Sequence, residues 1–197
     1  MASTRHRTGV DLERLTGVQE RRVSVGDEDS LTLAAGAALD CLARSHNRAE
    51  ALDVVVGCSI TKYRDGLVQW LEPPTSLAVS HAIGASNAMT FDLSNACAGM
   101  LTGVFVVNNW IRQGAIRRGL VVSGEYISQL AHNAARHVRT ILSRELASLT
   151  LGDAGAAVLI ERAPEGAPGI SVAGFTTVAD HSRLCLAYPA RHERGAR

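Results

Sequence analysis

The sequence is poor in aromatic residues and has almost no net charge. Phe, Trp and Tyr make up 4% of its 197 residues, and the formal net charge at neutral pH is +1. A dedicated nucleic-acid surface brings a strong basic excess, so the charge balance argues against a nucleic-acid partner. Apolar residues make up 46% of the chain, as in ordinary globular proteins, and this argues against disorder. We therefore expect a folded protein with a sizeable core.

Secretion signals and long apolar runs are also missing. The N-terminal stretch MASTRHRTGVD is polar and lacks the apolar segment of a signal peptide. The longest apolar run is interrupted at Asn108 and Asn109, so no segment is long enough to span a bilayer. These absences predict a cytoplasmic protein without a membrane span.

Cysteine is present, but no two cysteines form a C-x-x-C pair. The scattered positions argue against a zinc site, and a disulfide framework is not expected in a chain of this size. We expect free thiols, no metal ion and no cofactor. Cys41 and Cys58 fall within apolar segments and are interpreted as packing residues, whereas Cys185 is assigned no role. The fourth cysteine is Cys97, which stands between a short apolar run and a long one.

Hydrophobic periodicity alternates between helical and strand-like segments along the chain. Helices are predicted over residues 31–45, capped by Asp29 or Ser30, and over 75–84, capped by Thr75 and closed by Gly84. Further helices are predicted over 98–114, which is apolar on nearly every side and expected to be buried, and over 129–146. Short apolar runs predict strands at 52–60, 88–93, 119–124, 154–162 and 169–175.

This alternation of strands and helices predicts an α/β fold, with helices layered on a mixed, largely parallel β-sheet. The polar segment 129–146 allows two interpretations, a flap near a substrate channel or an amphipathic helix with a face in water. We favour the second, because helices of mixed charge usually face solvent.

Cys97 lies where the predicted strand 88–93 gives way to the predicted helix 98–114. Unpaired backbone N–H groups and the positive end of the helix dipole favour a thiolate at such a position. Alanine and glycine neighbours permit a tight turn and close approach of a substrate carbonyl, and the N–H of Cys97 would help to bind an oxyanion. The alternative, a small buried hydrophobic residue, is the commoner role for a lone cysteine.

Three motifs carry a resemblance to a known family. They are TGVQERR (16–22), DLSNACAGM around Cys97, and LTLGDAGAAVLIER (149–162). In order and spacing they resemble the thiolase superfamily, in particular its ketoacyl-ACP synthase III-like branch, over about residues 15–165. The resemblance implies a thiolase-like fold in which Cys97 is the nucleophile.

A further stretch, WLEPPTSLAVSHAIGASNAMTFDLSNAC, is similar to the OleA-type enzymes of olefin and β-lactone hydrocarbon biosynthesis, and so is VVSGEYIS (121–128). In those enzymes the glutamate of a Glu-Pro-x-Thr motif acts as a base in the partner subunit's active site. The resemblance assigns this role to Glu72. From the residues alone, a glutamate before two prolines is usually an exposed loop charge.

The resemblance implies a Claisen condensation of two acyl thioesters, acyl-CoA or acyl-ACP, to a β-ketoacyl product through an acyl-cysteine intermediate. The alternatives are a ketoacyl-ACP synthase III-type enzyme that starts chains, acyl transfer without C–C bond formation, and a non-catalytic partner subunit. The resemblance also implies a homodimer, or pairing with a complementary half chain.

Residues 1–165 are expected to form the amino-terminal half of the family's fold without its first strand. Residues 166–197 are expected to begin the connection to a carboxy-terminal half. The histidine and asparagine of that second half have no match here, and His81 is interpreted as an ordinary histidine. A piece of a longer protein and an enzyme split over two chains are favoured over a truncated, inactive relative.

Overall fold

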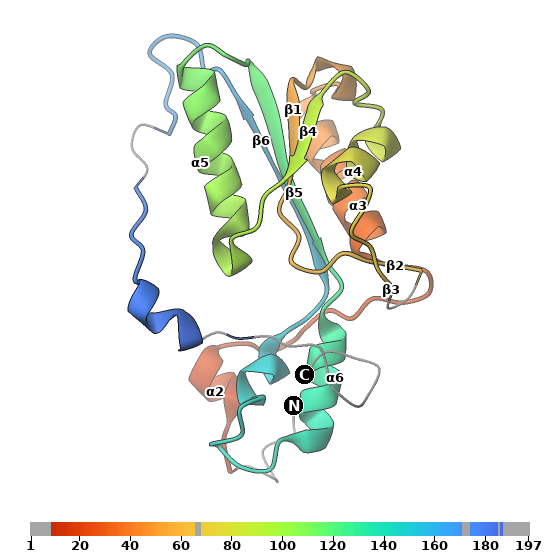
Figure 1. Cartoon of the computed structure of the whole chain (residues 1–197), viewed down its shortest axis with the longest axis vertical. Helices are drawn as coiled ribbons and strands as arrows, with labels where there is room; N and C mark the ends of the chain where they lie inside the picture. The colour runs from red at the N-terminus through yellow and green to blue at the C-terminus, as the bar shows by residue number, and fades with distance from the viewer. Residues whose placement is uncertain (1–8, 66–67, 171–173, 185, 187–197) are drawn as a thin grey trace. The chain divides into compact units, whose positions relative to one another are not determined.

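The computed structural model describes residues 9–65, 68–170, 174–184 and 186. The chain divides into two compact units, each assembled from separate segments (Figure 1). The sheet unit contains Gly26–Tyr126 and Ala154–Phe175, and the small unit contains Met1–Val25, Ile127–Asp153 and Thr176–Arg197. The boundary expected after residue 165 stays a prediction.

A four-stranded sheet forms the centre of the sheet unit, in the order β4-β1-β5-β6 (Figure 1). Strand β1 (Val54–Gly57) pairs in parallel with β4 (Met89–Asp92) on one side and with β5 (Arg118–Glu125) on the other. Strand β6 (Ala154–Glu161) is antiparallel to β5. The predicted α/β fold with a mixed, largely parallel sheet is therefore confirmed.

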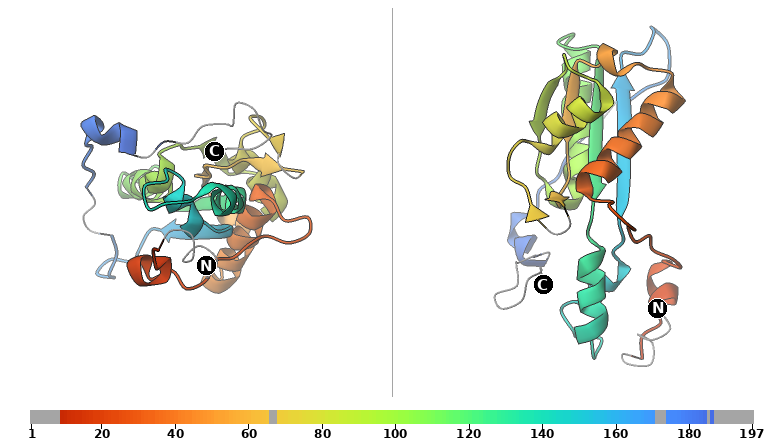
Figure 2. Two further views of the ribbon diagram at one scale, coloured as in Figure 1. Left: turned by 90° about the horizontal axis from the view of Figure 1, so that it is seen from below. Right: turned by 90° about the vertical axis from the view of Figure 1, so that its right-hand side faces the viewer.

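Helices cover both faces of this sheet because side chains of β1 alternate between them. Val55 packs with α3 (Ser30–Ser45) and α4 (Thr75–Ile83) on one face. Val54 and Val56 pack with α5 (Gly99–Arg112) on the other. Figure 2 shows α3 and α4 together on the side of the sheet opposite to α5.

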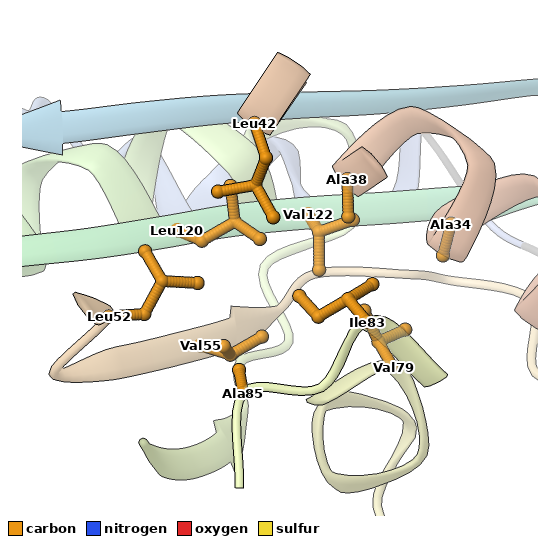
Figure 3. Close-up of a cluster of buried hydrophobic side chains, with 10 residues drawn as sticks. All are labelled: Ala34, Ala38, Leu42, Leu52, Val55, Val79, Ile83, Ala85, Leu120 and Val122. Atoms are coloured by element: carbon orange, nitrogen blue, oxygen red, sulfur yellow. The ribbon is translucent and has the colours of Figure 1, made fainter. Parts of the chain in front are cut away.

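The core on the α3–α4 face consists of branched aliphatic and alanine side chains. Figure 3 shows that they point inward from both helices and from strands β1 and β5. Each fully buried Leu, Ile or Val contributes roughly 1.5–3 kcal/mol of hydrophobic stabilisation. The members are Ala34, Ala38, Leu42, Leu52, Val55, Val79, Ile83, Ala85, Leu120 and Val122.

The strand order explains why the helices lie on opposite faces. From β1 the chain passes through α4 to β4 at one edge, and from β4 it returns through α5 to β5 on the far side of β1. Parallel crossovers are right-handed, so two crossovers that run in opposite directions place their helices on opposite faces. The loops that follow the parallel strands consequently meet at one edge of the sheet.

Helix caps agree with the sequence predictions in part. Asp29 caps α3 by accepting a hydrogen bond from the N–H of Thr32, and Gly84 ends α4 in the left-handed conformation. The expected cap of α4 by Thr75 is wrong, because Thr75 is already helical and makes no side-chain cap. The N–H of Thr75 donates instead to the carboxylate of Asp92, 17 residues further along the chain.

Helix α5 is less buried than its composition predicts. Gly103, Val107 and Ile111 face the sheet, but 69% of Leu101 is exposed within the described chain. An apolar composition does not indicate which face is covered, so periodicity alone overestimated the burial. No helix among the described residues has the length and hydropathy needed to cross a bilayer.

Two further predicted elements differ in the structure. The helix expected over 129–146 ends early, because α6 (Ser128–His137) stops where Val138 turns to extended backbone. Ser143 then accepts hydrogen bonds from the N–H groups of Arg139 and Thr140 and closes a turn. Of the strand expected over 169–175, residues 171–173 lie outside the described residues and the others are not in a strand.

Several short elements were not predicted because their periodicity is too brief to detect. They are the helix α2 (Leu12–Thr16), the hairpin of β2 (Tyr63–Arg64) and β3 (Val68–Gln69), and four 3₁₀ turns. The turns are η1 (Ala49–Ala51), η2 (Ala96–Ala98), η3 (Leu146–Thr150) and η4 (Ala179–Leu184).

The small unit has its own core and a buried carboxylate. Leu12 of α2, Ala134 of α6, Val138 and Leu149 of η3 pack together. Next to η3, Asp153 is only 5% exposed. Its carboxylate accepts hydrogen bonds from three backbone N–H groups, at 2.8 Å from Ser24, 2.6 Å from Ile127 and 2.7 Å from Ser128.

Asp153 joins two of the sequence motifs. It belongs to the LGDAG segment, and its own N–H donates to the carbonyl of Arg22 in TGVQERR at 2.9 Å. Burial alone would raise the pKa of Asp153, but the hydrogen bonds from Ser24, Ser128 and Ile127 outweigh it and lower that pKa below its usual value. Asp153 therefore stabilises the small unit as an anion.

Asp153→Asn should destabilise the protein at neutral pH by about 1–3 kcal/mol, because an amide cannot accept all three hydrogen bonds. A lowered folded-state pKa stabilises above the unfolded-chain pKa of about 3.9, and this stabilisation disappears as pH falls through the folded-state value. The difference in thermal midpoint between wild type and variant should therefore shrink below about pH 4. Asp180→Asn, which removes an exposed carboxylate, is the control. A pH-independent difference would contradict the assignment.

Candidate active site around Cys97

Strands β1 and β4 end together, at Gly57 and Asp92, whereas β5 runs past Val122, the partner of Gly57, and ends at Glu125. In open α/β sheets ligands bind outside the carboxyl ends of the strands, where the chain reverses its direction across the sheet. The segment with Cys97 follows β4 at this edge, and the segment with Lys62 follows β1. This edge is the candidate site.

Cys97 lies in the turn η2, between β4 and α5, and it is exposed. The preceding residue, Ala96, has a φ of 41°, in the left-handed region that alanine rarely adopts. Strained backbone of this kind occurs at functional sites, and the turn on which serine hydrolases expose their nucleophile is similarly strained. Because Cys97 is exposed here, it is not a buried packing residue in the described chain.

Side chains hold this turn against the first turn of α5. The amide nitrogen of Asn95 donates to the hydroxyl of Thr102 at 2.8 Å, and that hydroxyl donates to the carbonyl of Ala98 at 2.9 Å. Helix α5 has no side-chain cap at its start. The N–H of Gly99 donates to the carbonyl of Ala96, and no side chain competes with a negatively charged oxygen next to Cys97 for the positive start of this helix.

The other described cysteines occupy the environments predicted for them. Cys41 is half-buried and Cys58, directly after β1, is buried. Burial, together with the negative charge of Asp92, raises the pKa of the Cys58 thiol to about 11. Cys58 therefore stays protonated and unreactive at neutral pH. Cys185 lies outside the described residues.

Glu72 is exposed, in the segment that leads into α4. The Glu72–Pro73 peptide bond is cis. Among the described contacts, no hydrogen bond or ion pair joins Glu72 to Cys97. Exposure is compatible with Glu72 as an ordinary loop charge and also with a role toward another subunit. The role of Glu72 as a base therefore stays a prediction. His81, on α4, is exposed as an ordinary surface histidine.

Asp92 is a residue of this edge that the sequence analysis did not identify. Its carboxylate accepts hydrogen bonds at 2.6 Å from the Lys62 ammonium, at 3.0 Å from the N–H of Thr75 and at 2.9 Å from that of Ser76. Burial would raise the pKa of Asp92, but these hydrogen bonds, the one from Lys62 foremost, lower it below its usual value. The one feature of the sequence that could have indicated Asp92 was an acidic residue at the end of an apolar strand.

Glu125 fixes the loop after β1 in a similar way. Its carboxylate accepts hydrogen bonds from the N–H of Ile60 at 2.6 Å, and from the N–H and hydroxyl of Thr61 at 2.9 and 2.7 Å. The Ser123 hydroxyl adds a fourth at 3.0 Å. The loop that carries Lys62 is therefore held to the end of β5 by charge-assisted hydrogen bonds.

The sheet unit is a mixed α/β sheet, and its candidate site presents an exposed thiol on a strained turn before a helix. The fold and the site thus define an α/β protein with an exposed cysteine at the start of a helix. The sequence profile described as 3-oxoacyl-[acyl-carrier-protein (ACP)] synthase III matches residues 91–180, which include the Cys97 turn. The β-ketoacyl-ACP synthase III of Clostridium tetani is 31% identical over 152 residues, 77% of this chain and 41% of the relative. The enzyme of Streptomyces lividans is 31% identical over 160 residues, 81% of this chain and 42% of the relative.

Solved structures give a similar result. Cerulenin-bound Xanthomonas campestris OleA superposes with a TM-score of 0.68 at 27% identity, over 82% of this chain and 49% of that one. An OleA variant with a histidine replaced by alanine gives a TM-score of 0.67 at 29% identity. The chain belongs to the ketoacyl-ACP synthase III-like branch of the thiolase superfamily. It spans about two fifths of the curated relatives and about half of the OleA chains.

The position of the Cys97 turn depends on close packing of α5 against the sheet. A Cβ atom on Gly103 would lie 2.7 Å from Cγ1 of Val121 and 3.0 Å from Sγ of Cys58. Val121 is β-branched and lies in a central strand, so it has little freedom to move aside. Glycine at this position lets the helix approach the end of β1 and the middle of β5.

Gly103→Ala should lower the free energy of unfolding by about 1–3 kcal/mol through overpacking, measured by urea denaturation. The matched control is Gly36→Ala in α3, where a Cβ meets nothing within 4 Å. That change should stabilise by roughly 0.5–1 kcal/mol, because alanine favours helix over glycine. Equal effects of the two substitutions would show that α5 does not pack as tightly as described.

Proposed function

We propose that this chain provides the nucleophilic half of an enzyme that condenses two acyl thioesters to a β-ketoacyl product. The observation that carries the proposal is the exposed Cys97 on a strained turn before the uncapped start of α5. Membership of the ketoacyl-ACP synthase III-like branch supports it. Because the chain spans only part of its relatives, we propose that the rest of the site comes from further residues or from another chain.

In the first step the Cys97 thiolate attacks the carbonyl carbon of an acyl-CoA or acyl-ACP. The C–S bond of the substrate breaks, the carrier leaves as a thiolate that takes up a proton, and the acyl group remains on Cys97. The oxyanion that forms during attack accepts hydrogen bonds from backbone N–H groups at the turn, including that of Cys97. This splits one difficult condensation into two easier steps.

In the second step a base removes a proton from the α-carbon of another acyl thioester. We assign this base to Glu72, acting in a partner subunit. The carbanion attacks the acyl carbon on Cys97, the new C–C bond forms, and Cys97 leaves as thiolate. The similarity to OleA supports this version of the reaction.

A second candidate is a chain-initiating enzyme of the ketoacyl-ACP synthase III type. The curated relatives favour it, because they carry that name at 30–31% identity over about three quarters of this chain. In this version loss of CO₂ from a malonyl thioester generates the carbanion, so no base is required and Glu72 has no role in the chemistry.

We further propose that the chain pairs with a second copy of itself or with a complementary half chain. Strand β4 is at the end of the sheet order, so one of its edges has no strand partner among the described residues. Its first residue, Met89, is 52% exposed. An exposed strand edge is a template for pairing with another chain.

Incubation of the chain with an acyl-CoA should add one acyl group to Cys97, seen as a mass shift in intact-protein mass spectrometry. Cys97→Ala should abolish the adduct, and Cys41→Ala should retain it, because Cys41 is half-buried in α3. Native mass spectrometry of the same sample reports whether the adduct belongs to a monomer or a dimer. An adduct on the Cys97→Ala variant would refute the assignment of the nucleophile.

Glu72→Gln should reduce condensation of two acyl-CoA molecules by about 10²–10⁴-fold, the usual contribution of a general base. The assay uses the assembly that contains this chain in its host. The acyl adduct on Cys97 and any malonyl-dependent condensation should persist. Glu165→Gln, which changes an exposed glutamate in a turn, is the control. Selective loss of malonyl-dependent condensation would exclude the OleA-like reaction.

A further inference from the structure

We infer that Asp92, paired with Lys62, is a positioning residue that holds the Cys97 turn and the Glu72 segment in one fixed arrangement. The effect of Asp92 on catalysis rests on the proposed function. Its structural content, that one carboxylate fixes both segments, is independent of that function and can be measured separately.

The carboxylate of Asp92 connects three parts of the chain that are distant in sequence. One oxygen accepts from the Lys62 ammonium and from the N–H of Thr75, and the other accepts from the N–H of Ser76. Lys62 belongs to the loop after β1, Thr75 and Ser76 begin α4, and Asp92 ends β4. The Asp92 side chain thus caps α4 and joins the start of that helix and the loop after β1 to the end of β4.

The Asp92 carboxylate packs closely against the end of β1. A Cβ atom on Gly57, the β1 residue paired with Asp92, would lie 2.6 Å from the Asp92 Oδ1 atom and 3.0 Å from the backbone nitrogen of Ser76. Glycine at this position therefore allows the carboxylate to fit between the end of β1 and the start of α4. The Asp92 carboxylate therefore fixes the distance between these two segments and does not act through its charge alone.

Both proposed functional residues are joined to this carboxylate by short stretches of chain. Cys97 is five residues after Asp92, and Glu72 is three residues before Thr75. The stretch from Glu72 contains Pro73 and Pro74, whose rings fix φ, and this limits how far Glu72 moves relative to Thr75.

Lys62 strengthens the connection from the other side of Glu72. Its carbonyl accepts a hydrogen bond from the N–H of Trp70 at 2.9 Å, closing the base of the β2–β3 hairpin two residues before Glu72. The Lys62 and Asp92 side chains are 27% and 17% exposed. An ion pair at this depth is less screened than a surface pair, and removing one partner leaves the other charge poorly compensated.

The test compares Asp92→Asn and Lys62→Met with wild type in the full chain, using two reactions of Cys97. Alkylation by iodoacetamide requires only a reactive thiolate, whereas acylation by acyl-CoA also requires a positioned carbonyl. Asp92→Asn should lower acylation about tenfold or more, with a change in alkylation below about threefold. A purely electrostatic role predicts the opposite pattern, faster alkylation once the negative charge is removed.

Conservative rescue and a matched ion pair provide the controls. Lys62→Met should lower acylation less than Asp92→Asn, and Lys62→Arg should restore it to within about twofold, since arginine keeps the charge-assisted hydrogen bond. Arg44→Met removes an exposed ion pair with Asp40 on α3 and should leave both reactions unchanged. Failure of Lys62→Arg to restore acylation above Lys62→Met would overturn the role of the ion pair.

Amide hydrogen exchange separates failure of this inference from failure of the proposed function. Asp92→Asn should speed exchange by about tenfold or more at Thr75 and Ser76, and also at residues 96–98. If wild type is never acylated, the proposed function fails. Whether Asp92 holds the Cys97 turn is then decided by amide exchange at residues 96–98 alone. Faster exchange confined to α4 would show that Asp92 only caps that helix. If Asp92→Asn does not fold, Lys62→Met is measured in the same way.

Discussion

The sheet unit depends on strand β1, whose four residues are all buried and whose two edges both pair with parallel neighbours. Parallel pairing excludes hairpins, so each neighbour is reached through a helix that crosses a face of the sheet. The two crossovers run in opposite directions, which places α4 and α5 on opposite faces. The Cys97 turn, Asp92 and the Lys62 loop meet at one edge because β1 is central.

Helix N-termini in this protein are served mainly by aspartate. Asp11 and Asp29 cap α2 and α3 from the adjacent residue. Asp92 and Asp153 serve α4 and α6 from further along the chain. Among the described helices, α5 alone begins without a carboxylate. A carboxylate at α5 would compete with an oxyanion for the same N–H groups, so the helix next to Cys97 is the one suited to bind an anion.

Periodicity was sufficient to predict the larger elements of the fold. The strands at Val54–Gly57, Met89–Asp92 and Arg118–Glu125 and the three helices that pack on them follow from local patterns of apolar residues. The turn at Cys97 was predicted from its place between a strand and a helix, whereas its exposure was not. The family motifs added the proposed nucleophile and base, which local patterns did not distinguish from a packing cysteine and a loop charge.

The rest depended on contacts between residues distant in sequence. No local pattern indicates that Asp92 serves the start of α4, or that Val138 ends α6 by entering a core with Leu12. The length of α6 and the function of Asp92 were therefore missed for the same reason.

The distant caps also have a consequence for the order in which helices become stable. Asp29 is adjacent to α3, so its cap forms as soon as that segment turns helical. The carboxylates of Asp92 and Asp153 reach α4 and α6 only after β4 and the LGDAG segment are in place. Helices of nine and ten residues are marginal on their own in water. The capped first turns of α4 and α6 are thus products of tertiary folding, whereas the cap of α3 can precede it.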